Sequence, residues 1–280
     1  MVVADILSNN EPTLERYQDR IERIFPFEKG EPKASVVIVT FGTPMKEVAL
    51  TVDKIRGDAV EVLVINNDRS DGKNPFDHSD VTYVAMKRNA GVCVARNLGA
   101  VLARSNIVIF LDDDAIPGDD LVEAHAKEHL DPSVLAVRGR CLPKTHNLPN
   151  RIAFHYDLGS ERIPSPIDLE GNSSFKRKEL LACGGFNEDL PLSGGWEGVE
   201  VSRRLVQMSG DLSSVIYSPS PTIYHDYKSN SFQLLSKLLR HRRNLGQMSQ
   251  GQEGLMEFFD RYPRQTNPLQ KIKKAALTYR

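Results

Sequence analysis

Three consecutive carboxylates, Asp112, Asp113 and Asp114, directly follow an apolar run at residues 107–111. The run has the length and the apolar content of a buried strand, so it would deliver three negative charges to one point. Such grouping is costly unless cations or hydrogen-bond donors compensate the charge. Mg²⁺ or Mn²⁺ compensates it by taking one or two carboxylates together with phosphate oxygens of a nucleotide. Alternate residues of an extended chain point the same way, which makes Asp112 and Asp114 candidate ligands of one metal. A solvated strand end, or a helix cap before Leu121, is the alternative.

A second segment whose residue types could bind a ligand is Asn-Ala-Gly-Val-Cys-Val-Ala-Arg-Asn at residues 89–97. Gly91 suits a turn in which the backbone approaches another group closely. Arg96 and Asn97 begin a helix near that turn, and helix N-termini favour anionic groups. The alternative is a capped helix with a surface arginine.

The elements that must position these groups alternate between strands and helices. Strands are expected at residues 35–41, 60–65, 81–85 and 107–111, and helices at 45–56 and 93–103. This alternation predicts an α/β fold with a Rossmann-like, mostly parallel central sheet flanked by helices. Ligands of such sheets bind at the carboxyl ends of the strands. The polar clusters at 66–71 and 112–114 both follow predicted strands, so we expect the site there.

Composition narrows the class of protein. The chain has 280 residues and a formal net charge of −1, which argues against nucleic-acid binding across the whole surface. No apolar run approaches the roughly 20 residues needed to span a bilayer, and the first ten residues do not read as a signal peptide. The three cysteines are widely spaced, which favours reduced thiols over a disulfide framework. We therefore expect a cytoplasmic protein without a transmembrane segment and without a nucleic-acid partner.

Several segments, in order, carry a resemblance to a known family. They are the strand at 35–41, the polar loop at 66–72, the segment at 89–97, Phe-Leu-Asp-Asp-Asp at 110–114, Gly-Gly-Phe-Asn-Glu at 184–188, and Trp-Glu-Gly-Val-Glu at 196–200 followed by Arg204-Leu205. Together they resemble family 2 glycosyltransferases of the GT-A fold. The similarity spans about residues 34–228.

The resemblance implies a nucleotide-sugar donor, with a UDP-sugar favoured, and Mn²⁺ or Mg²⁺ as cofactor. It implies that Asp112 and Asp114 are the DXD pair that binds the metal, with His225 as a further ligand. It implies a nucleotide-sugar site made by Thr40, Phe41, Asn66, Asp68, Asn89, Gly91, Arg96, Asn97, Asp112, Asp113 and Trp196. Asn66 stands where the family usually has an Asp that recognises the base, and its amide offers a base both hydrogen-bond donors and an acceptor. The acceptor, which could be a glycan, a lipid-linked molecule or a small molecule, and the oligomeric state stay open.

The catalytic carboxylate is the second departure from the family. Gly198 occupies the position of the usual catalytic Asp, which leaves Glu197 and Glu200 as the nearby candidates. Three residues apart on a helix, they share a face. Inversion needs a general base, for which Glu197 is our first candidate. A retaining mechanism, a non-catalytic domain that binds sugar nucleotides or glycans, and a sugar nucleotidyltransferase are the alternatives.

The chain divides into three predicted parts. Residues 1–33 are expected to form an amphipathic helical extension and a linker, with Leu14, Tyr17, Ile21 and Ile24 at helical spacing. Residues 34–228 form the glycosyltransferase domain, with a nucleotide-binding half at 34–118 and an acceptor half at 119–228. Residues 229–280 form a basic helical extension, whose charges are either a solvated face or a clamp on an anionic ligand.

Overall fold

The computed structural model describes residues 14–27, 30–68, 73–76, 80–145, 157–190, 196–226, 239 and 254–262. Its strands are β1 (Ile21–Phe25), β2 (Ala34–Thr40), β3 (Val60–Asn66), β4 (Val81–Met86), β5 (Ile107–Asp112), β6 (Ile116–Pro117), β7 (Ala136–Leu142), β8 (Ile163–Pro164), β9 (Asn172–Lys176) and β10 (Val215–Tyr224). Its α-helices are α2 (Met45–Ile55), α3 (Val92–Leu102), α4 (Leu121–Glu128), α6 (Arg177–Ala182), α7 (Glu197–Ser209) and α9 (Leu255–Asp260), and its 3₁₀ helices are η1 (Glu15–Arg20) and η3 (Leu212–Ser214).

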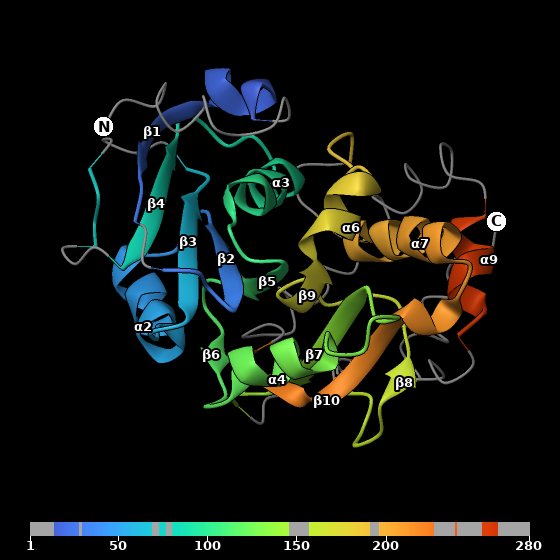
Figure 1. Cartoon of the computed structure of the whole chain (residues 1–280). Coiled ribbons are helices and arrows are strands. Elements are labelled where there is room, and N and C mark those ends of the chain that lie inside the picture. Colours follow the sequence, from blue (N-terminus) through green and yellow to red (C-terminus); the bar gives the residue numbers. More distant parts are fainter. Residues whose placement is uncertain are drawn as a thin grey trace.

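The described strands form one mixed sheet in the order β1-β4-β3-β2-β5-β9-β7-β10-β6, and β8 pairs with β10 (Figure 1). Strands β4, β3, β2 and β5 make a parallel block. In that block Thr40 pairs with Asn66, and Val39 pairs with Asp112. The carboxyl ends of β2, β3 and β5 therefore meet at one edge, which confirms the predicted fold class.

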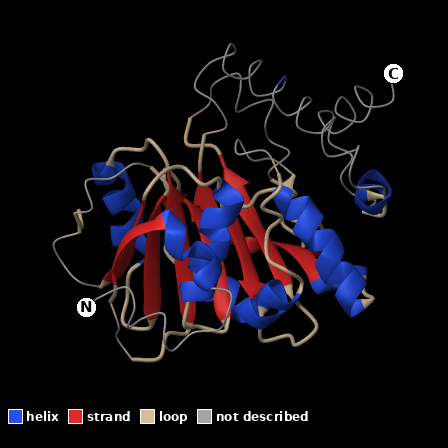
Figure 2. Ribbon diagram, turned by 90° about the horizontal axis from the view of Figure 1, so that it is seen from above, coloured by secondary structure: helices blue, strands red, loops and turns tan. Residues whose placement is uncertain are grey.

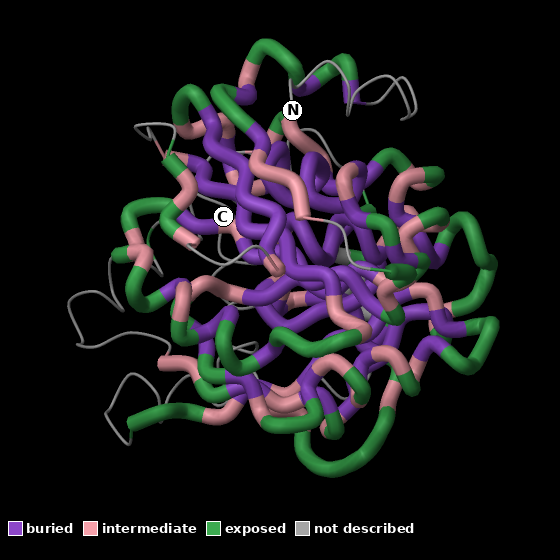
Figure 3. The backbone as a smooth tube through the Cα atoms, turned by 60° about the vertical axis from the view of Figure 1, so that its left-hand side comes forward, coloured by how far each residue is buried: buried purple, intermediate pink, exposed green. Residues whose placement is uncertain are grey.

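Helices cover both faces of the sheet, as Figure 2 shows. Along β2, Val37 belongs to the core cluster beneath α3 and α7, whereas Val36 and Ile38 belong to the cluster beneath α2 and α4. This follows from the period of two in a strand, which sends successive side chains to opposite faces. Figure 3 shows the buried backbone in the middle of the molecule and exposed segments around it.

The N-terminal segment differs from the prediction of an amphipathic helix. A 3₁₀ helix ends at Arg20, and Ile21 begins β1, which pairs antiparallel with β4 at the edge of the sheet. Leu14, Tyr17, Ile21 and Ile24 are all buried, as their spacing predicted, but they reach the core from two kinds of element. Pairing with β4 satisfies the backbone of this segment better than an isolated helix of this length would.

The second half of the chain extends the sheet through β9, β7 and β10, and α6 and α7 lie beside each other over it (Figure 1). Among the helices described, none is long and apolar enough to cross a membrane. Within the predicted basic extension at 229–280, the structure describes only Leu239 and residues 254–262.

Candidate active site

The acidic triplet lies at the carboxyl edge of the parallel block, as the sequence predicted. Strand β5 ends at Asp112, and Asp113 and Asp114 form a turn. The Asp112 backbone N–H donates to the carbonyl of Gly171 at 3.1 Å. A side chain at position 171 would place Cβ 1.9 Å from the Asp112 carboxyl carbon. A side chain at 171 would displace the Asp112 carboxylate, which lies against the Gly171 backbone.

Asp114 and His225, which are 111 positions apart, are brought together across this edge. The Asp114 Oδ1 and His225 Nε2 atoms are 2.9 Å apart, and the Lys144 ammonium donates to the Asp114 carbonyl. Burial raises the pKa of Asp114, but the hydrogen bond and charge of His225 outweigh it and hold this pKa below its usual range. Burial lowers the pKa of His225, but Asp114 and Asp112 outweigh it and raise this pKa.

Of the three predicted metal ligands, Asp114 and His225 face each other, and the charge of Asp112 also acts on His225. No group of three metal-ligating side chains is found among the residues that the structure describes. Strand β5 ends at Asp112, so the alternation of side chains along a strand does not extend to Asp114. Asp112 lies against Gly171, whereas Asp114 faces His225.

Asp113 points toward β2 and α2 instead. Burial raises the pKa of its carboxyl, the charges of Asp114 and Asp112 add to the rise, and the hydroxyls of Thr40 and Thr43 oppose it. Thr51 donates to the Asp113 carbonyl at 3.2 Å. Thr40 is fully buried, whereas the next residue, Phe41, exposes 56% of its surface at this edge.

The loops after β3 and β4 are joined by asparagines. Asn66 donates to the Tyr83 hydroxyl at 2.8 Å and accepts from the Asp68 backbone N–H at 3.1 Å. Asn67, which sequence reasoning missed, donates to Asn89 at 3.1 Å. These contacts fix the two loops against each other.

Gly91, just before α3, and Asn97, within α3, both have structural roles. Gly91 precedes α3 with φ of 94°, a conformation that favours glycine, and its N–H donates to Asn89 Oδ1 at 2.9 Å. The Asn97 side chain donates to the carbonyl of Phe186 at 2.8 Å and accepts from its N–H at 2.7 Å. It also donates to Glu188 at 2.9 Å. Asn97 therefore ties α3 to the Gly-Gly-Phe turn.

Arg96 lies beneath the site and pairs with the first residue of α7. Its Nη1 is 2.9 Å from Glu197 Oε1, and its guanidinium lies over the Phe186 ring, 5.5 Å from the centroid. Burial lowers the pKa of Arg96, but the charges of Glu197, Glu170 and Asp112 outweigh burial and raise it.

Glu200 is buried and pairs with Arg204, one turn further along α7. Arg204 Nε donates to Glu200 Oε1 at 2.9 Å, and its Nη2 donates to Oε2 at 2.6 Å. Arg204 also donates to the carbonyls of Cys183 and Gly185. The pair anchors α7 to the Gly-Gly-Phe turn.

Trp196 immediately precedes α7 and is partly buried against the core cluster beneath α3. Its φ of 72° lies in the left-handed region, which is uncommon and strained for a residue with a bulky side chain. The backbone at the start of α7 is thus held in a constrained geometry.

Glu170 is the residue that sequence reasoning missed at this site. Its Oε1 accepts from the Gly198 N–H at 2.8 Å. Burial raises the pKa of its carboxyl, Glu197 adds to the rise, and Arg96 opposes it. The signal in the sequence was one acidic residue before Gly-Asn in an irregular, proline-rich stretch, which is too weak to single it out.

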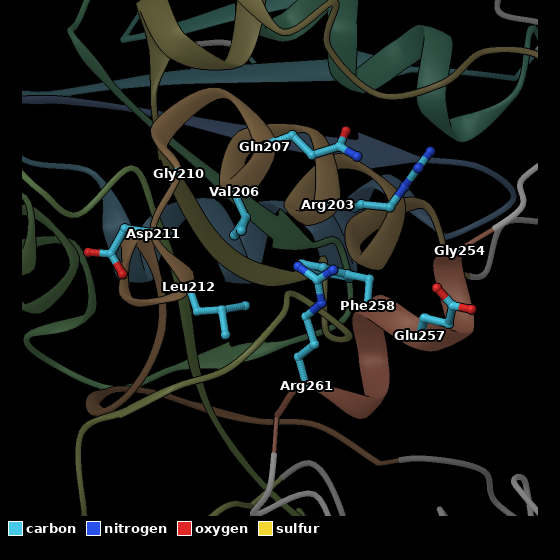
Figure 4. Close-up of a pocket in the computed structure, with 10 residues that line it drawn as sticks. All are labelled: Arg203, Val206, Gln207, Gly210, Asp211, Leu212, Gly254, Glu257, Phe258 and Arg261. Atoms are coloured by element: carbon cyan, nitrogen blue, oxygen red, sulfur yellow. The ribbon is translucent and has the colours of Figure 1, made fainter.

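A cavity of about 690 Å³ lies between the C-terminal half of α7 and α9 (Figure 4). Arg203, Gln207 and Arg261 are among the residues around it. At a rise of about 1.5 Å per residue, Gln207 lies roughly 15 Å along α7 from Glu197. The cavity is therefore separate from the carboxyl edge.

Comparison with known proteins assigns the family. The family described as "Glycosyl transferase family 2" matches residues 35–186, more than half of the chain. The chain belongs to glycosyltransferase family 2. Two curated relatives are a pre-mycofactocin glycosyltransferase of Mycobacterium tuberculosis, 26% identical over 163 residues, and a glucosyl-dolichyl phosphate glucuronosyltransferase of Haloferax volcanii, 24% identical over 219 residues. The alignments cover 54% of this chain and 33% of the first relative, and 69% of both chains for the second. This chain thus spans about a third of the length of the mycobacterial relative.

Solved structures support the same fold. A mannosyltransferase from Pyrobaculum calidifontis in complex with GDP-Man and Mn²⁺ superimposes with a TM-score of 0.59 at 18% identity, covering 95% of this chain and 76% of that one. GalNAc-T7 with UDP, GalNAc and Mn²⁺ gives a TM-score of 0.53 at 17% identity, covering 72% and 45%. The predicted family and its GT-A fold are confirmed.

Proposed function

We propose that this protein transfers a sugar from a nucleoside diphosphate sugar, with a UDP-sugar favoured, to an acceptor hydroxyl with inversion, in a metal-dependent reaction. The observation that carries the proposal is the contact between Asp114 and His225 at the carboxyl edge of β2, β3 and β5. Membership of family 2 supports it, as do two GT-A neighbours that were solved with nucleotides and Mn²⁺. The reduced, separate cysteines support a cytoplasmic location.

The chemistry of the donor set fits a divalent cation. A carboxylate oxygen of Asp114 and the Nε2 atom of His225 already face each other, and both are ligand types that Mn²⁺ accepts. Asp112, at the end of the same strand, is our third proposed ligand. When bound, Mn²⁺ or Mg²⁺ supplies positive charge to the leaving diphosphate.

The nucleotide is proposed to bind beside these residues. The exposed ring of Phe41 offers an apolar face for a base, and Thr40 precedes it at the end of β2. Asn66 replaces the family's base-recognising Asp, and its contacts with Tyr83 and Asp68 fix the orientation of its amide.

Other predicted site residues receive positioning roles in this proposal. The side chains of Arg96 and Asn97 bond within the protein, and Asn89 holds the turn at Gly91. We propose that they shape the donor site rather than contact the donor. Asp113 and Trp196 are proposed to border the donor and the acceptor, respectively.

The test combines binding and product analysis. We expect UDP or another nucleoside diphosphate to raise the melting temperature with MnCl₂ present, since a ligand that binds only the native state stabilises it, and EDTA to remove the effect. Asp114→Ala should lose the effect, whereas Asp119→Ala, which removes an exposed carboxylate seven positions beyond Asp112, should retain it. Incubation with a panel of sugar nucleotides should give transfer or donor hydrolysis, and NMR of the product should show inversion. If no donor is turned over while nucleotides still bind, the protein is a non-catalytic binding domain.

A further inference from the structure

The N-terminal turn of α7 contains a position where a side chain is sterically excluded. A Cβ atom at Gly198 would lie 2.5 Å from the carbonyl oxygen of Ile167 and 2.7 Å from Glu170 Oε1. It would also lie 3.0 Å from Glu170 Cγ. The carboxylate of Glu170 thus occupies the space into which a side chain at 198 would project.

The contact with α7 is a directed hydrogen bond. The Gly198 N–H donates to Glu170 Oε1 at 2.8 Å, and position 198 lies in the first turn of the helix. A negative charge is favourable there because the first N–H groups of a helix lack partners within the helix. This hydrogen bond orients the Glu170 carboxylate at the end of α7.

The two carboxylates on α7 itself are engaged in ion pairs. Glu197 is 3% exposed and pairs with Arg96, and Glu200 is 3% exposed with both oxygens on Arg204. The Glu170 residue as a whole is half-buried, and its carboxyl group is buried as theirs are. Within the described residues it makes no ion pair, so its carboxylate is the one best placed to exchange a proton.

Glu170 also lies next to the acidic edge. The following residue, Gly171, accepts the Asp112 N–H at 3.1 Å and packs directly against the Asp112 carboxylate. The Glu170 backbone is therefore one residue from the point where the donor diphosphate is proposed to bind, as a base that deprotonates the attacking acceptor would need to be.

We propose that Glu170 is the catalytic base of the transfer reaction, supplying from the segment before β9 the carboxylate that α7 lacks at Gly198. This inference rests on the proposed function. The acceptor oxygen forms the new bond to the anomeric carbon, the bond from that carbon to the diphosphate oxygen breaks, and the nucleoside diphosphate leaves with the bonding electron pair. Glu170 takes the proton that the acceptor hydroxyl loses.

The surroundings of Glu170 support this role. Burial and the neighbouring Glu197 raise the pKa of its carboxyl, with Arg96 in opposition, so proton uptake is more favourable than for an ordinary glutamate. A base whose pKa lies near the working pH is the most effective one.

The test compares Glu170→Gln with Glu197→Gln and Glu200→Gln, using Glu123→Gln on the exposed side of α4 as the control. Each holoenzyme, with Mn²⁺ and a turned-over donor, is assayed for kcat, for donor affinity by calorimetry and for its pH–rate profile. Thermal melting checks that each variant is folded. Glu170→Asp is included because it retains a carboxylate if the glutamine variant is unstable.

We expect Glu170→Gln to lower kcat by roughly 10²–10⁴-fold with donor affinity within about twofold, and to flatten the acid limb of the pH profile. Glu170→Asp should retain that limb at reduced kcat. The inference is overturned if Glu170→Gln keeps parental kcat while the parent enzyme is active, or if the parent product retains the anomeric configuration, because no such base is then needed. A parent that binds nucleotide but turns over no donor overturns the proposed function and the base together.

Discussion

Replacing Gly198 by alanine tests two opposing effects on the free energy of unfolding. Helix propensity predicts a gain in stability, whereas steric overlap of the new methyl group predicts a loss. Gly198 lies inside α7, and its backbone does not have positive φ. Helix propensity alone would therefore favour alanine by about 0.5–1 kcal/mol. The structure predicts the opposite sign, because the new Cβ would lie 2.5 Å from the Ile167 carbonyl oxygen and 2.7 Å from Glu170 Oε1.

The size of the stability loss depends on whether the atoms that the new Cβ would meet can move away. The Glu170 carboxylate can rotate away at the cost of its hydrogen bond to the Gly198 N–H, but the Ile167 oxygen belongs to the backbone. Overpacking of this kind costs typically about 1–3 kcal/mol. After the gain in helix propensity, we expect Gly198→Ala to lower the free energy of unfolding by about 1–2 kcal/mol.

Urea unfolding measures this change as a shift in midpoint at constant slope. Gly57→Ala is the matched control, because its Cβ would meet only Val60 Cγ2, at 4.0 Å. That variant should stay within about 0.5 kcal/mol of the parent. Glu170→Ala combined with Gly198→Ala should lose less stability than the two single changes added, because one of the two close contacts is gone. A Gly198→Ala protein as stable as the parent would refute the steric argument.

Three further predictions concern the titratable side chains His225, His129 and Glu170. His225→Ala should weaken Mn²⁺-dependent nucleotide binding in calorimetry more than it lowers the melting temperature without metal, because the imidazole contacts Asp114 on a partly exposed edge; equal Mn²⁺ dependence in variant and parent would contradict this. Burial lowers the pKa of His125 to about 4 and that of His129 to about 3. Since the unfolded chain binds protons below about pH 6.5 that the folded chain excludes, the free energy of unfolding should fall as the pH is lowered from about 6.5 toward 4, and His129→Gln should reduce that slope in urea titrations. For Glu170 the sign is reversed: burial raises its pKa to about 8, so its contribution to the free energy of unfolding should fall as the pH rises from about 4.5 to 8. Glu170→Gln should therefore gain stability relative to the parent at alkaline pH, and an unchanged difference between pH 5 and pH 8.5 would contradict the raised pKa.

The parallel block could be predicted from the sequence because local pattern and tertiary role agree there. The predicted strand at residues 107–111 and the observed β5 differ only by Asp112, and the predicted helix at 93–103 is shifted by one residue from α3. Strand β1 could not be predicted in the same way. Its apolar residues Ile21 and Ile24 fit a helical spacing, and only pairing with β4, about sixty residues away, determines that they form a strand.

The position of the candidate site could be predicted for the polar residues that directly follow a strand. Asp112 and Asp114 could be placed at the sheet edge from the apolar run that precedes them. Their separate orientations could not, because they depend on where β5 stops. The contact of Glu170 with Gly198 joins residues 28 positions apart, with β9 and α6 between them, and no periodic pattern marks either residue. In the sequence, Gly198 could be identified only as a glycine at the position of the family's usual catalytic Asp; its contact with Glu170 could not.

The charges around Arg96 support the proposal that Glu170 supplies the carboxylate that is absent at Gly198. Arg96 is buried and makes its direct ion pair with Glu197, so a single positive charge serves two acidic groups. Close like charges in a buried site cannot both ionise without cost, and one of the two carboxyls must have a raised pKa. Burial raises the pKa of Glu170 and the charge of Glu197 adds to the rise, whereas Arg96 and the Gly198 N–H only oppose it. Accepting a proton from the acceptor hydroxyl would relieve the repulsion with Glu197 without breaking the Glu197–Arg96 pair. In this proposal Glu197 is the structural partner of Arg96, and Glu170 is the carboxylate that takes the proton.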